Sequence, residues 1–344
     1  MEEPRSLLRG QQQQPEELKR RIVVLKDNVP SAAQEADRIS SQVGGQVGYV
    51  YEHALKGFSI MLPETAVAGI ENNPNVKFVE EDYEVSIFTQ TIPTGIQRIF
   101  ADTNAEINVD GNDDYRVDVD VAVIDTGIDL NHPDLNVVGG TDCTLSSGAG
   151  RWRTYYCGGP SEGTGGDDDH YHGTHVAGTI AALDNGIGVV GVAPGARLWA
   201  VKVLDSSGSG YTSGIIAGID WVTSRGDIEV ANMSIGGSGY SQAEFEAIGK
   251  AVEFGVAFAV AAGNDDDDAS NYSPAAFSNC LTVSALADFD GEPGELGQPT
   301  CRDDLDDTLA DFSNWGGSVD IAAPGVCIYS TFPGGGYDTL SGTS

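Results

Sequence analysis

The spacing of hydrophobic positions changes near Val119, and this change divides the chain. Before that point an apolar strand, a helix, alternating strands, a short helix and a last strand follow one another. This order predicts a small α+β unit over residues 21–88. Residues 1–20 are polar and glutamine-rich and contain no apolar stretch, so they are interpreted as a disordered tail and not as a signal peptide.

From Val119 onward, nearly continuous apolar strands alternate with helices. Strands of this kind are buried on both faces, so the pattern predicts an α/β fold with a parallel sheet between two layers of helices. Residues 89–344 are expected to form this second domain, with its functional side chains at the carboxyl ends of the strands. The predicted strands are 119–125, 196–204, 227–235, 256–264 and 280–287, and the predicted helices are 174–183, 212–226 and 241–255.

The chain is strongly acidic, with 52 acidic and 18 basic side chains and a net charge of −34. A nucleic-acid-binding protein is normally basic, and an anionic membrane surface would repel this chain, so neither partner is expected. Much of the excess lies in runs at 167–169, 265–268 and 303–307. These runs are interpreted as solvated loops, with divalent-ion binding and adaptation to high salt as alternatives.

The five cysteines contain no CxxC pair, so a zinc ribbon or a thioredoxin-type site is not expected. Cys143 and Cys157 flank a loop rich in glycine and serine, while Cys301 follows another loop and Cys327 opens a short apolar run. We predict disulfides between Cys143 and Cys157 and between Cys301 and Cys327. Cys280 opens an apolar strand and is predicted to be a buried free thiol. Two disulfides indicate an oxidising compartment.

Four short motifs end or follow predicted strands. They are AVIDTGID with Asp125, HYHGTHVAGT with His172, AVAAGN with Asn264 and SGTS with Ser344. Each alone has a plain structural explanation, such as a helix cap or a turn. Together they supply a triad for acyl transfer, because a serine hydroxyl needs a base to take its proton and the base needs a carboxylate to orient it. The amide of Asn264 can then donate to the oxyanion.

Three other interpretations of these motifs compete with the triad. Asp125-Thr126-Gly127 spells the D-T-G of an aspartic protease, but that mechanism needs two such carboxylates, and the second copy at Asp205 has the wrong spacing. The cluster of His170, His172 and His175 could hold a metal, but it lacks the spacing of HExxH. A pseudoprotease or binding module is the remaining alternative, and the presence of all four catalytic residue types argues against it.

The motifs AVIDTGID, HGTHVAGTIAA, NMSIGG, AVAAGN, VDIAAPG and GTS occur in the order typical of subtilases. Over residues 21–344 the chain resembles this family of subtilisin-like serine proteases (peptidase S8), with an N-terminal I9-type inhibitory prodomain. The resemblance implies a subtilisin-like parallel sheet after a ferredoxin-like α+β prodomain. It implies that Asp125 orients the base, His172 is general base and acid, Ser344 is the nucleophile and Asn264 completes the oxyanion hole.

By the same resemblance, the substrate lies as an added strand between two backbone edges. Small residues in the main specificity pocket imply a large apolar side chain before the cleaved bond; the alternative is that these residues merely serve turns. Residues 21–88 would act as folding assistant and inhibitor until cleavage between Phe88 and Thr89. The implied edges are Ser234, Ile235 and Gly236 on one side and Gly208, Ser209 and Gly210 on the other, and the implied pocket residues are Ala261, Ala262 and Gly263.

The loop from Leu183 to Gly191 resembles the calcium loop of the family. Calcium takes six to eight oxygen ligands, many of them carbonyl and amide oxygens. The implied ligands are the side chains of Gln90, Asp134 and Asn185 and the backbone oxygens of Leu183, Ile187 and Val189.

The resemblance therefore implies a secreted, monomeric serine endopeptidase zymogen that acts on protein and peptide substrates and has its own prodomain as intramolecular inhibitor. The chain departs from the family at Tyr171, where a glycine usually precedes the catalytic histidine. The family motif also continues past the serine into a buried helix. The sequence is therefore expected to be truncated at Ser344, and residues 1–344 to be inactive by themselves.

Overall fold

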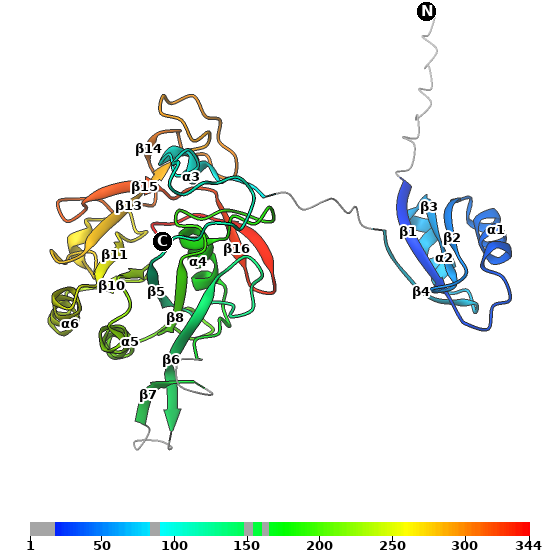
Figure 1. Ribbon diagram of the computed structural model, residues 1–344. Helices are drawn as coiled ribbons and strands as arrows, with labels where there is room; N and C mark the ends of the chain where they lie inside the picture. The colour runs from blue at the N-terminus through cyan, green and yellow to red at the C-terminus, as the bar shows by residue number, and fades with distance from the viewer. Residues whose placement is uncertain (1–17, 83–89, 148–153, 160–164) are drawn as a thin grey trace, which may run out of the picture. The chain divides into compact units, whose positions relative to one another are not determined.

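The computed structural model describes residues 18–82, 90–147, 154–159 and 165–344 (Figure 1). The chain divides into two compact units, Met1–Ile87 and Phe88–Ser344, and each has its own hydrophobic core. Within the described ranges, no helix combines the length and the apolar character that crossing a membrane requires. The expected cleavage point, Phe88 and Thr89, lies outside the described residues.

The first unit has the predicted ferredoxin-like α+β fold. Its four strands are all antiparallel to their neighbours, in the order β2-β3-β1-β4. Side chains of both helices and of the sheet share one core, which includes Ile39, Phe58 and Ile70. The elements in chain order are β1 (Leu18–Leu25), α1 (Ala32–Val43), β2 (Gln46–Tyr51), β3 (Gly57–Pro63), η1 (Glu64–Ala66), α2 (Val67–Glu71) and β4 (Val76–Glu81).

The first strand begins earlier than the sequence pattern indicated. Strand β1 starts at Leu18, so residues 18–20 lie in the sheet and not in the tail expected over residues 1–20. Leu18 pairs with Pro63, and the two basic residues that follow it continue the same register along β3. Their charge made them resemble the polar tail, but the start of β1 is partly open to solvent and accepts charged side chains.

Local signals in the sequence mark several helix ends. The hydroxyl of Ser241 accepts a hydrogen bond from the backbone N–H of Glu244 at 3.3 Å, which confirms it as the N-cap of α6 (Gln242–Glu253). Ser31 caps α1 in the same way. Gly226 ends α5 (Thr212–Arg225) in the left-handed conformation, with φ of 71°, which glycine adopts without steric cost.

The second unit is built on a nine-stranded sheet. Its central strands, in the order β13-β11-β9-β5-β8-β6, run parallel, and β7 and β14 pair antiparallel at its two ends. The ninth strand, β15, pairs parallel with β13. The elements in chain order are α3 (Thr94–Arg98), β5 (Asp120–Asp125), β6 (Val137–Ser147), β7 (Thr154–Gly158), α4 (His172–Ala181), β8 (Arg197–Lys202), α5 (Thr212–Arg225), β9 (Val230–Met233), β10 (Gly237–Ser238), α6 (Gln242–Glu253), β11 (Ala257–Ala261), η3 (Ala269–Asn271), β12 (Tyr272–Ser273), β13 (Leu281–Ala287), β14 (Thr308–Leu309), β15 (Ile321–Pro324), β16 (Ile328–Phe332) and β17 (Gly336–Leu340).

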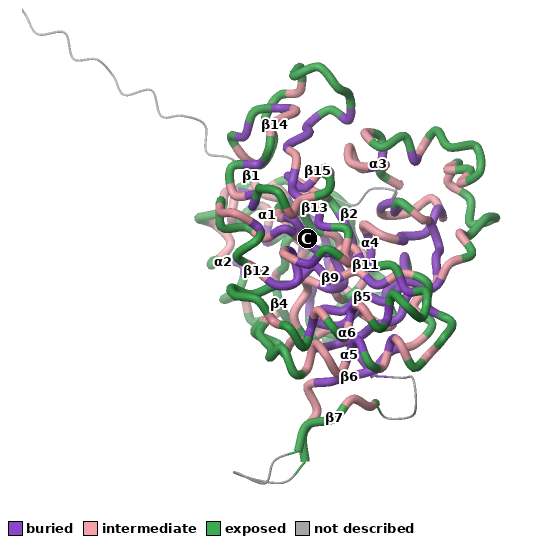
Figure 2. Tube along the Cα trace, turned by 90° about the vertical axis from the view of Figure 1, so that its left-hand side faces the viewer, coloured by how far each residue is buried: buried purple, intermediate pink, exposed green. Residues whose placement is uncertain are grey.

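Helices cover both faces of this sheet, as predicted. Along β5, Ala122 and Ile124 belong to a core that includes buried residues of α5 and α6, while Val121 and Val123 belong to a second core that includes α4. All six residues of β5 are buried, and Figure 2 shows the buried stretches gathered in the central strands. Because the strand alternates between two apolar cores, it reads as continuously apolar in the sequence.

Candidate active site

The end of the central strand β5 brings Asp125 against His172. Asp125 is the last residue of β5 and is fully buried, and His172 is the first residue of α4. The imidazole Nδ1 lies 2.8 Å from Oδ1 and 3.0 Å from Oδ2 of Asp125. The carboxylate also accepts a hydrogen bond from the backbone N–H of Thr126 at 2.6 Å. Its position and its contact with Nδ1 fix the ring orientation that a general base needs.

A second carboxylate, Asp168, fixes the start of α4. It accepts hydrogen bonds from the hydroxyls of Thr126 at 3.0 Å and Thr174 at 2.5 Å, and from the backbone N–H of His170 at 2.9 Å. The hydroxyl of Thr126 in turn accepts from the N–H of Gly173 at 3.0 Å. The sequence pattern assigned Asp168 to a solvated acidic run and missed this role. Its position four residues before His172 was the available signal.

Tyr171, where the family usually has glycine, leaves this turn intact. Its φ is 168°, an extended conformation that any residue adopts. Its ring stacks on His170, with centroids 4.0 Å apart, and on Phe332, with centroids 5.3 Å apart. The tyrosine side chain therefore packs beside the site, and position 171 does not require a glycine.

The environment of His172 favours its protonated form. Burial alone would lower the pKa of the imidazole, but the hydrogen bond and charge of Asp125, with the charge of Asp168, outweigh burial and raise the pKa above its ordinary value. A raised pKa makes His172 a better proton acceptor.

Ser344 and Asn264 lie on the same cleft as His172. The hydroxyl of Ser344 donates to the backbone carbonyl of Ser234 at 3.3 Å, and among the described residues it makes no hydrogen bond to His172. The Asn264 side-chain oxygen accepts from the N–H and the hydroxyl of Thr343 at 2.9 and 3.0 Å. These contacts use the oxygen end of the amide and leave its NH₂ end to the cleft.

The cleft has a volume of about 730 Å³, and a neighbouring cavity of about 450 Å³ adjoins it. Ser234, Ser344 and Asn264 line both spaces. The residues expected to form the two backbone edges, 208–210 and 234–236, line the first space. The residues expected to form the specificity pocket, Ala261, Ala262 and Gly263, line the second. All nine residues are thus grouped around Ser344.

The side chains expected to bind calcium gather around the loop after α4. Asp134 is fully buried, and its carboxylate accepts from the Asn185 amide at 3.0 Å and from the Val189 N–H at 3.2 Å. The Gln90 amide points at the backbone oxygens of Leu183 and Val189, at 2.7 and 3.2 Å. The remaining expected ligand, Ile187, lies in the same loop and donates its N–H to the Asn185 side-chain oxygen at 3.1 Å.

The carboxylate of Asp134 has no basic partner among the described residues. Burial raises its pKa to about 7, against a smaller opposing effect of its hydrogen bonds. The side-chain amides of Gln90 and Asn185 present their nitrogens here, and turning each amide by about 180° would present its oxygen instead. Together with Asp134 and the loop carbonyls, these would be the oxygen ligands that a hard cation such as calcium prefers. The residues therefore fit a calcium ion.

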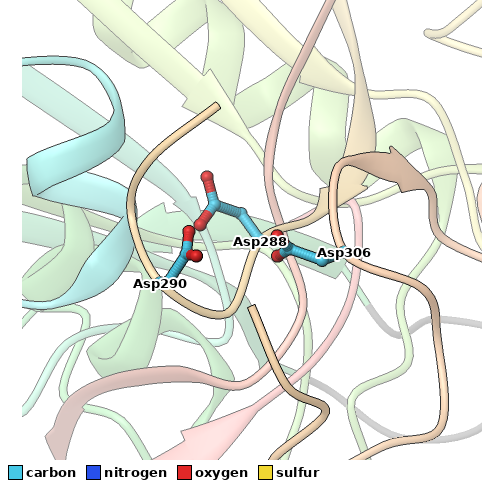
Figure 3. A group of neighbouring side chains, drawn as sticks. All are labelled: Asp288, Asp290 and Asp306. Atoms are coloured by element: carbon cyan, nitrogen blue, oxygen red, sulfur yellow. The ribbon is translucent and has the colours of Figure 1, made fainter. Parts of the chain in front are cut away.

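Another acidic cluster ties loops together. Asp288, Asp290 and Asp306 place carboxylate oxygens within 4.8 Å of one another (Figure 3). Asp288 pairs with Arg98 at 2.7 Å, and Asp306 accepts from the Phe289 N–H at 2.8 Å. Asp306 belongs to the run at 303–307, for which a solvated loop was expected. This residue is buried instead, because the backbone N–H groups of Phe289 and Gly297 donate to its carboxylate.

Both predicted disulfides are confirmed. Cys143 is bonded to Cys157 and Cys301 to Cys327, and Cys280 is the free thiol. Cys280 is partly buried against the core under α6, and burial raises the pKa of its thiol to about 12. It is therefore protonated and unreactive at neutral pH.

Comparison with known proteins agrees with this geometry. The model of the subtilase family matches residues 117–344, and that of peptidase inhibitor I9 matches residues 11–88. Subtilisin E of Bacillus subtilis (strain 168) is 40% identical over 317 residues, which cover 91% of this chain and 73% of that protein. The subtilisin of Bacillus pumilus is 42% identical over 258 residues, which cover 74% and 80%.

A solved structure extends the likeness to the fold. A cold-adapted subtilisin-like serine proteinase superposes with a TM-score of 0.52 at 37% identity, covering 69% of this chain and 71% of the other. The chain therefore belongs to the subtilase family of serine peptidases and carries a peptidase inhibitor I9 prodomain ahead of its subtilase region.

Proposed function

We propose that the protein is a secreted serine endopeptidase zymogen that hydrolyses peptide bonds through Asp125, His172 and Ser344. The observation that carries this proposal is the buried contact between Asp125 and His172, which opens on a cleft shared with Ser344 and Asn264. Its two disulfides fit an oxidising compartment outside the cell.

In the proposed mechanism, the Nδ1–H of His172 donates to Asp125, so that Nε2 is free to accept a proton. Rotation about the Cα–Cβ bond of Ser344 would turn its hydroxyl from the carbonyl of Ser234 toward His172. The serine oxygen, losing its proton to His172, then attacks the substrate carbonyl, and the C–N bond breaks as His172 passes this proton to the leaving amine. A water molecule that gives its proton to His172 then hydrolyses the acyl-enzyme ester and restores Ser344. The amide NH₂ of Asn264 would donate to the oxyanion, a role whose magnitude of about 10²–10³ in turnover was established on subtilisin itself.

The substrate would bind as an extended strand along the edge at 234–236, facing the edge at 208–210. The cavity beside Ser344 has walls of Ala261, Ala262 and Gly263, and its volume of about 450 Å³ leaves room for a large side chain. The small side chains of Ala261, Ala262 and Gly263 leave space for a large apolar residue before the cleaved bond. Contacts through the substrate backbone tolerate many sequences, so the specificity is expected to be broad.

The region that matches inhibitor I9 would hold the enzyme inactive until it is cut. Cleavage is proposed between Phe88 and Thr89, because Phe88 is a large apolar residue of the kind that the cavity favours. The unit that ends at Ile87 folds around its own core, so it can remain folded after the cut and act as a separate inhibitor.

A calcium ion is proposed as a structural cofactor. It would be held by the side chains of Gln90, Asp134 and Asn185 and by the backbone oxygens of Leu183, Ile187 and Val189. Its charge would neutralise the buried carboxylate of Asp134 and tie the segment at Gln90 to the loop after α4.

Active-site labelling tests the proposed function. Enzyme matured from its gene should react with a fluorophosphonate probe at Ser344, as located by mass spectrometry of peptides, and Ser344→Ala should abolish both labelling and hydrolysis. A pseudoprotease or a binding module would bind peptides without either reaction. Hydrolysis that persists in Ser344→Ala would assign the activity to other residues.

A further inference from the structure

A buried carboxylate without a partner lies in the wall of the substrate cleft. Glu244, in the first turn of α6, is 2% exposed, and its Oε1 has no hydrogen-bond partner. The same side chain lines the cleft that His172 and Ser344 also line. Buried polar atoms are nearly always hydrogen-bonded, because removing them from water without compensation is costly. This atom therefore needs an explanation.

In this structure no neighbouring group supplies the missing partner. The hydroxyl of Ser241 accepts from the backbone N–H of Glu244, and that of Ser273 accepts from the Ser241 N–H and donates to the Gly239 carbonyl, at 2.9 Å from each. The nearby Ile215 and Leu204 are apolar, and no lysine or arginine is among the described residues that line the cleft. Oε1 of Glu244 is thus an acceptor that receives no hydrogen bond from the described residues.

Glu244 and the expected specificity pocket occupy different parts of the binding surface. Glu244 lines the cleft but not the adjoining cavity, whereas Ala261, Ala262 and Gly263 line the cavity but not the cleft. The backbone edge at 234–236 lines both. A substrate strand on this edge can therefore place one side chain in the cavity and another, further along the strand, at Glu244.

The electrostatics favour a cation as the missing group. Burial raises the pKa of Glu244 to about 7. The other titratable groups near it are acidic or neutral: the thiol of Cys280 has its pKa raised by burial first, and then by the charges of Glu244 and Asp320. Above about pH 7 Glu244 is therefore mostly ionised. An ammonium or guanidinium would satisfy both its charge and its acceptor atoms.

We propose that Glu244 makes this part of the cleft a subsite for a lysine or arginine side chain of the substrate, on the N-terminal side of the cleaved bond. This inference rests on the proposed peptidase function. The cationic group would donate to the carboxylate of Glu244, and its aliphatic stem would lie against Ile215 and Leu204. The enzyme would thus favour bonds that follow a large apolar residue and have a basic residue two to four positions before the bond.

The test compares lysine with norleucine, which has a similar aliphatic chain but no ammonium group. Peptide p-nitroanilides carry phenylalanine before the cleaved bond and lysine or norleucine at each of the three preceding positions in turn. For the wild-type enzyme, kcat/KM should favour lysine about 10- to 100-fold at one position. Glu244→Gln should bring this ratio close to one. Glu246→Gln removes the same charge from the exposed face of the same helix and should leave the ratio unchanged.

A wild-type enzyme without a preference for lysine at any of the three positions would overturn the proposal, and so would a preference that survives in Glu244→Gln. If Glu244→Gln does not fold by circular dichroism, Glu244→Leu replaces it, since leucine suits an apolar recess. If no substrate is hydrolysed, the result contradicts the proposed peptidase function but does not test the proposed subsite. The inference is then decided by calorimetric binding of the lysine and norleucine peptides to Ser344→Ala.

Discussion

Replacing Gly173 by alanine should disable the active site while leaving the fold largely intact. Gly173 follows His172 in α4, and its Cα faces the end of β5. A Cβ atom there would lie 2.0 Å from the backbone oxygen of Gly127 and 3.1 Å from Cβ of Asp125. An ordinary contact is 3.4 Å or more, so α4 and the Gly127 turn would have to separate by about 1.4 Å (3.4 minus 2.0). The clash lies between the residue after His172 and the turn that follows Asp125, so relieving it moves Asp125 and His172 relative to each other.

The expected loss of activity is larger than the loss of stability. Displacing a catalytic group by about 1 Å costs about 10²-fold in rate, so kcat/KM should fall by about 10²-fold or more. Overpacking costs about 1–3 kcal/mol of unfolding free energy. Replacing glycine by alanine in a helix returns about 1 kcal/mol. The net destabilisation should therefore be no more than about 2 kcal/mol.

Gly214→Ala, in α5, is the matched control, because its Cβ would meet nothing closer than 3.8 Å. It should keep full activity and gain up to about 1 kcal/mol. Urea unfolding measures stability, hydrolysis of a phenylalanine p-nitroanilide measures kcat/KM, and the proton NMR signal of the His172 Nδ1–H reports the contact with Asp125. The reasoning is refuted if Gly173→Ala keeps activity within threefold of wild type with that signal unshifted.

Three further predictions concern charge, calcium and the end of the chain. Asp168→Asn removes a charge that helps to raise the pKa of His172. The acidic limb of the pH profile of kcat/KM should therefore move to lower pH, and activity should fall. A limb that does not move would contradict the role of Asp168. Chelation of calcium should lower the melting temperature of the wild type but not of Asp134→Asn, as measured by calorimetry; equal losses would place the ion elsewhere. A variant truncated after Ser344 should not react with a fluorophosphonate or cut itself after Phe88, because its new terminal carboxylate would lie where the oxyanion must form. Self-cleavage by this variant that Ser344→Ala abolishes would contradict this.

The sequence predicted the elements that burial or capping marks locally. Strand β5 and the helix α6 with its Ser241 cap were predicted, since burial and capping leave local signatures. Strand β6 was missed because its residues, VVGGTDCTLSS, combine glycine and polar residues. Gly140 is needed there because a Cβ would lie 2.2 Å from the backbone oxygen of Ala200 in β8. The need for glycine at this position arises from the neighbouring strand β8, so the sequence of β6 alone gives no sign of it.

The candidate catalytic residues could be chosen from motifs, but their supporting residues could not. Asp168 and Asp306 both stand in acidic runs, where solvated loop is the reasonable interpretation. Their roles depend on N–H and hydroxyl donors from elsewhere in the fold, such as Thr126 for the first and Phe289 for the second. Whether an aspartate is solvated or buried is decided by these partners, and the local sequence does not contain them.

The contrast between two buried carboxylates, Asp125 and Glu244, indicates how function can be separated from structure in this chain. Asp125 is fully buried and receives bonds from Thr126 and His172. Glu244 is almost as buried and receives none at Oε1. A carboxylate that serves only the fold is selected together with its donors, because an unpaired one destabilises the native state. The chain has 52 acidic side chains, and Glu244 is buried at the border of the cleft without a hydrogen-bond donor for Oε1. The simplest source of this donor is a group of the substrate that enters the cleft. The missing partner of Glu244 is then a property of the substrate.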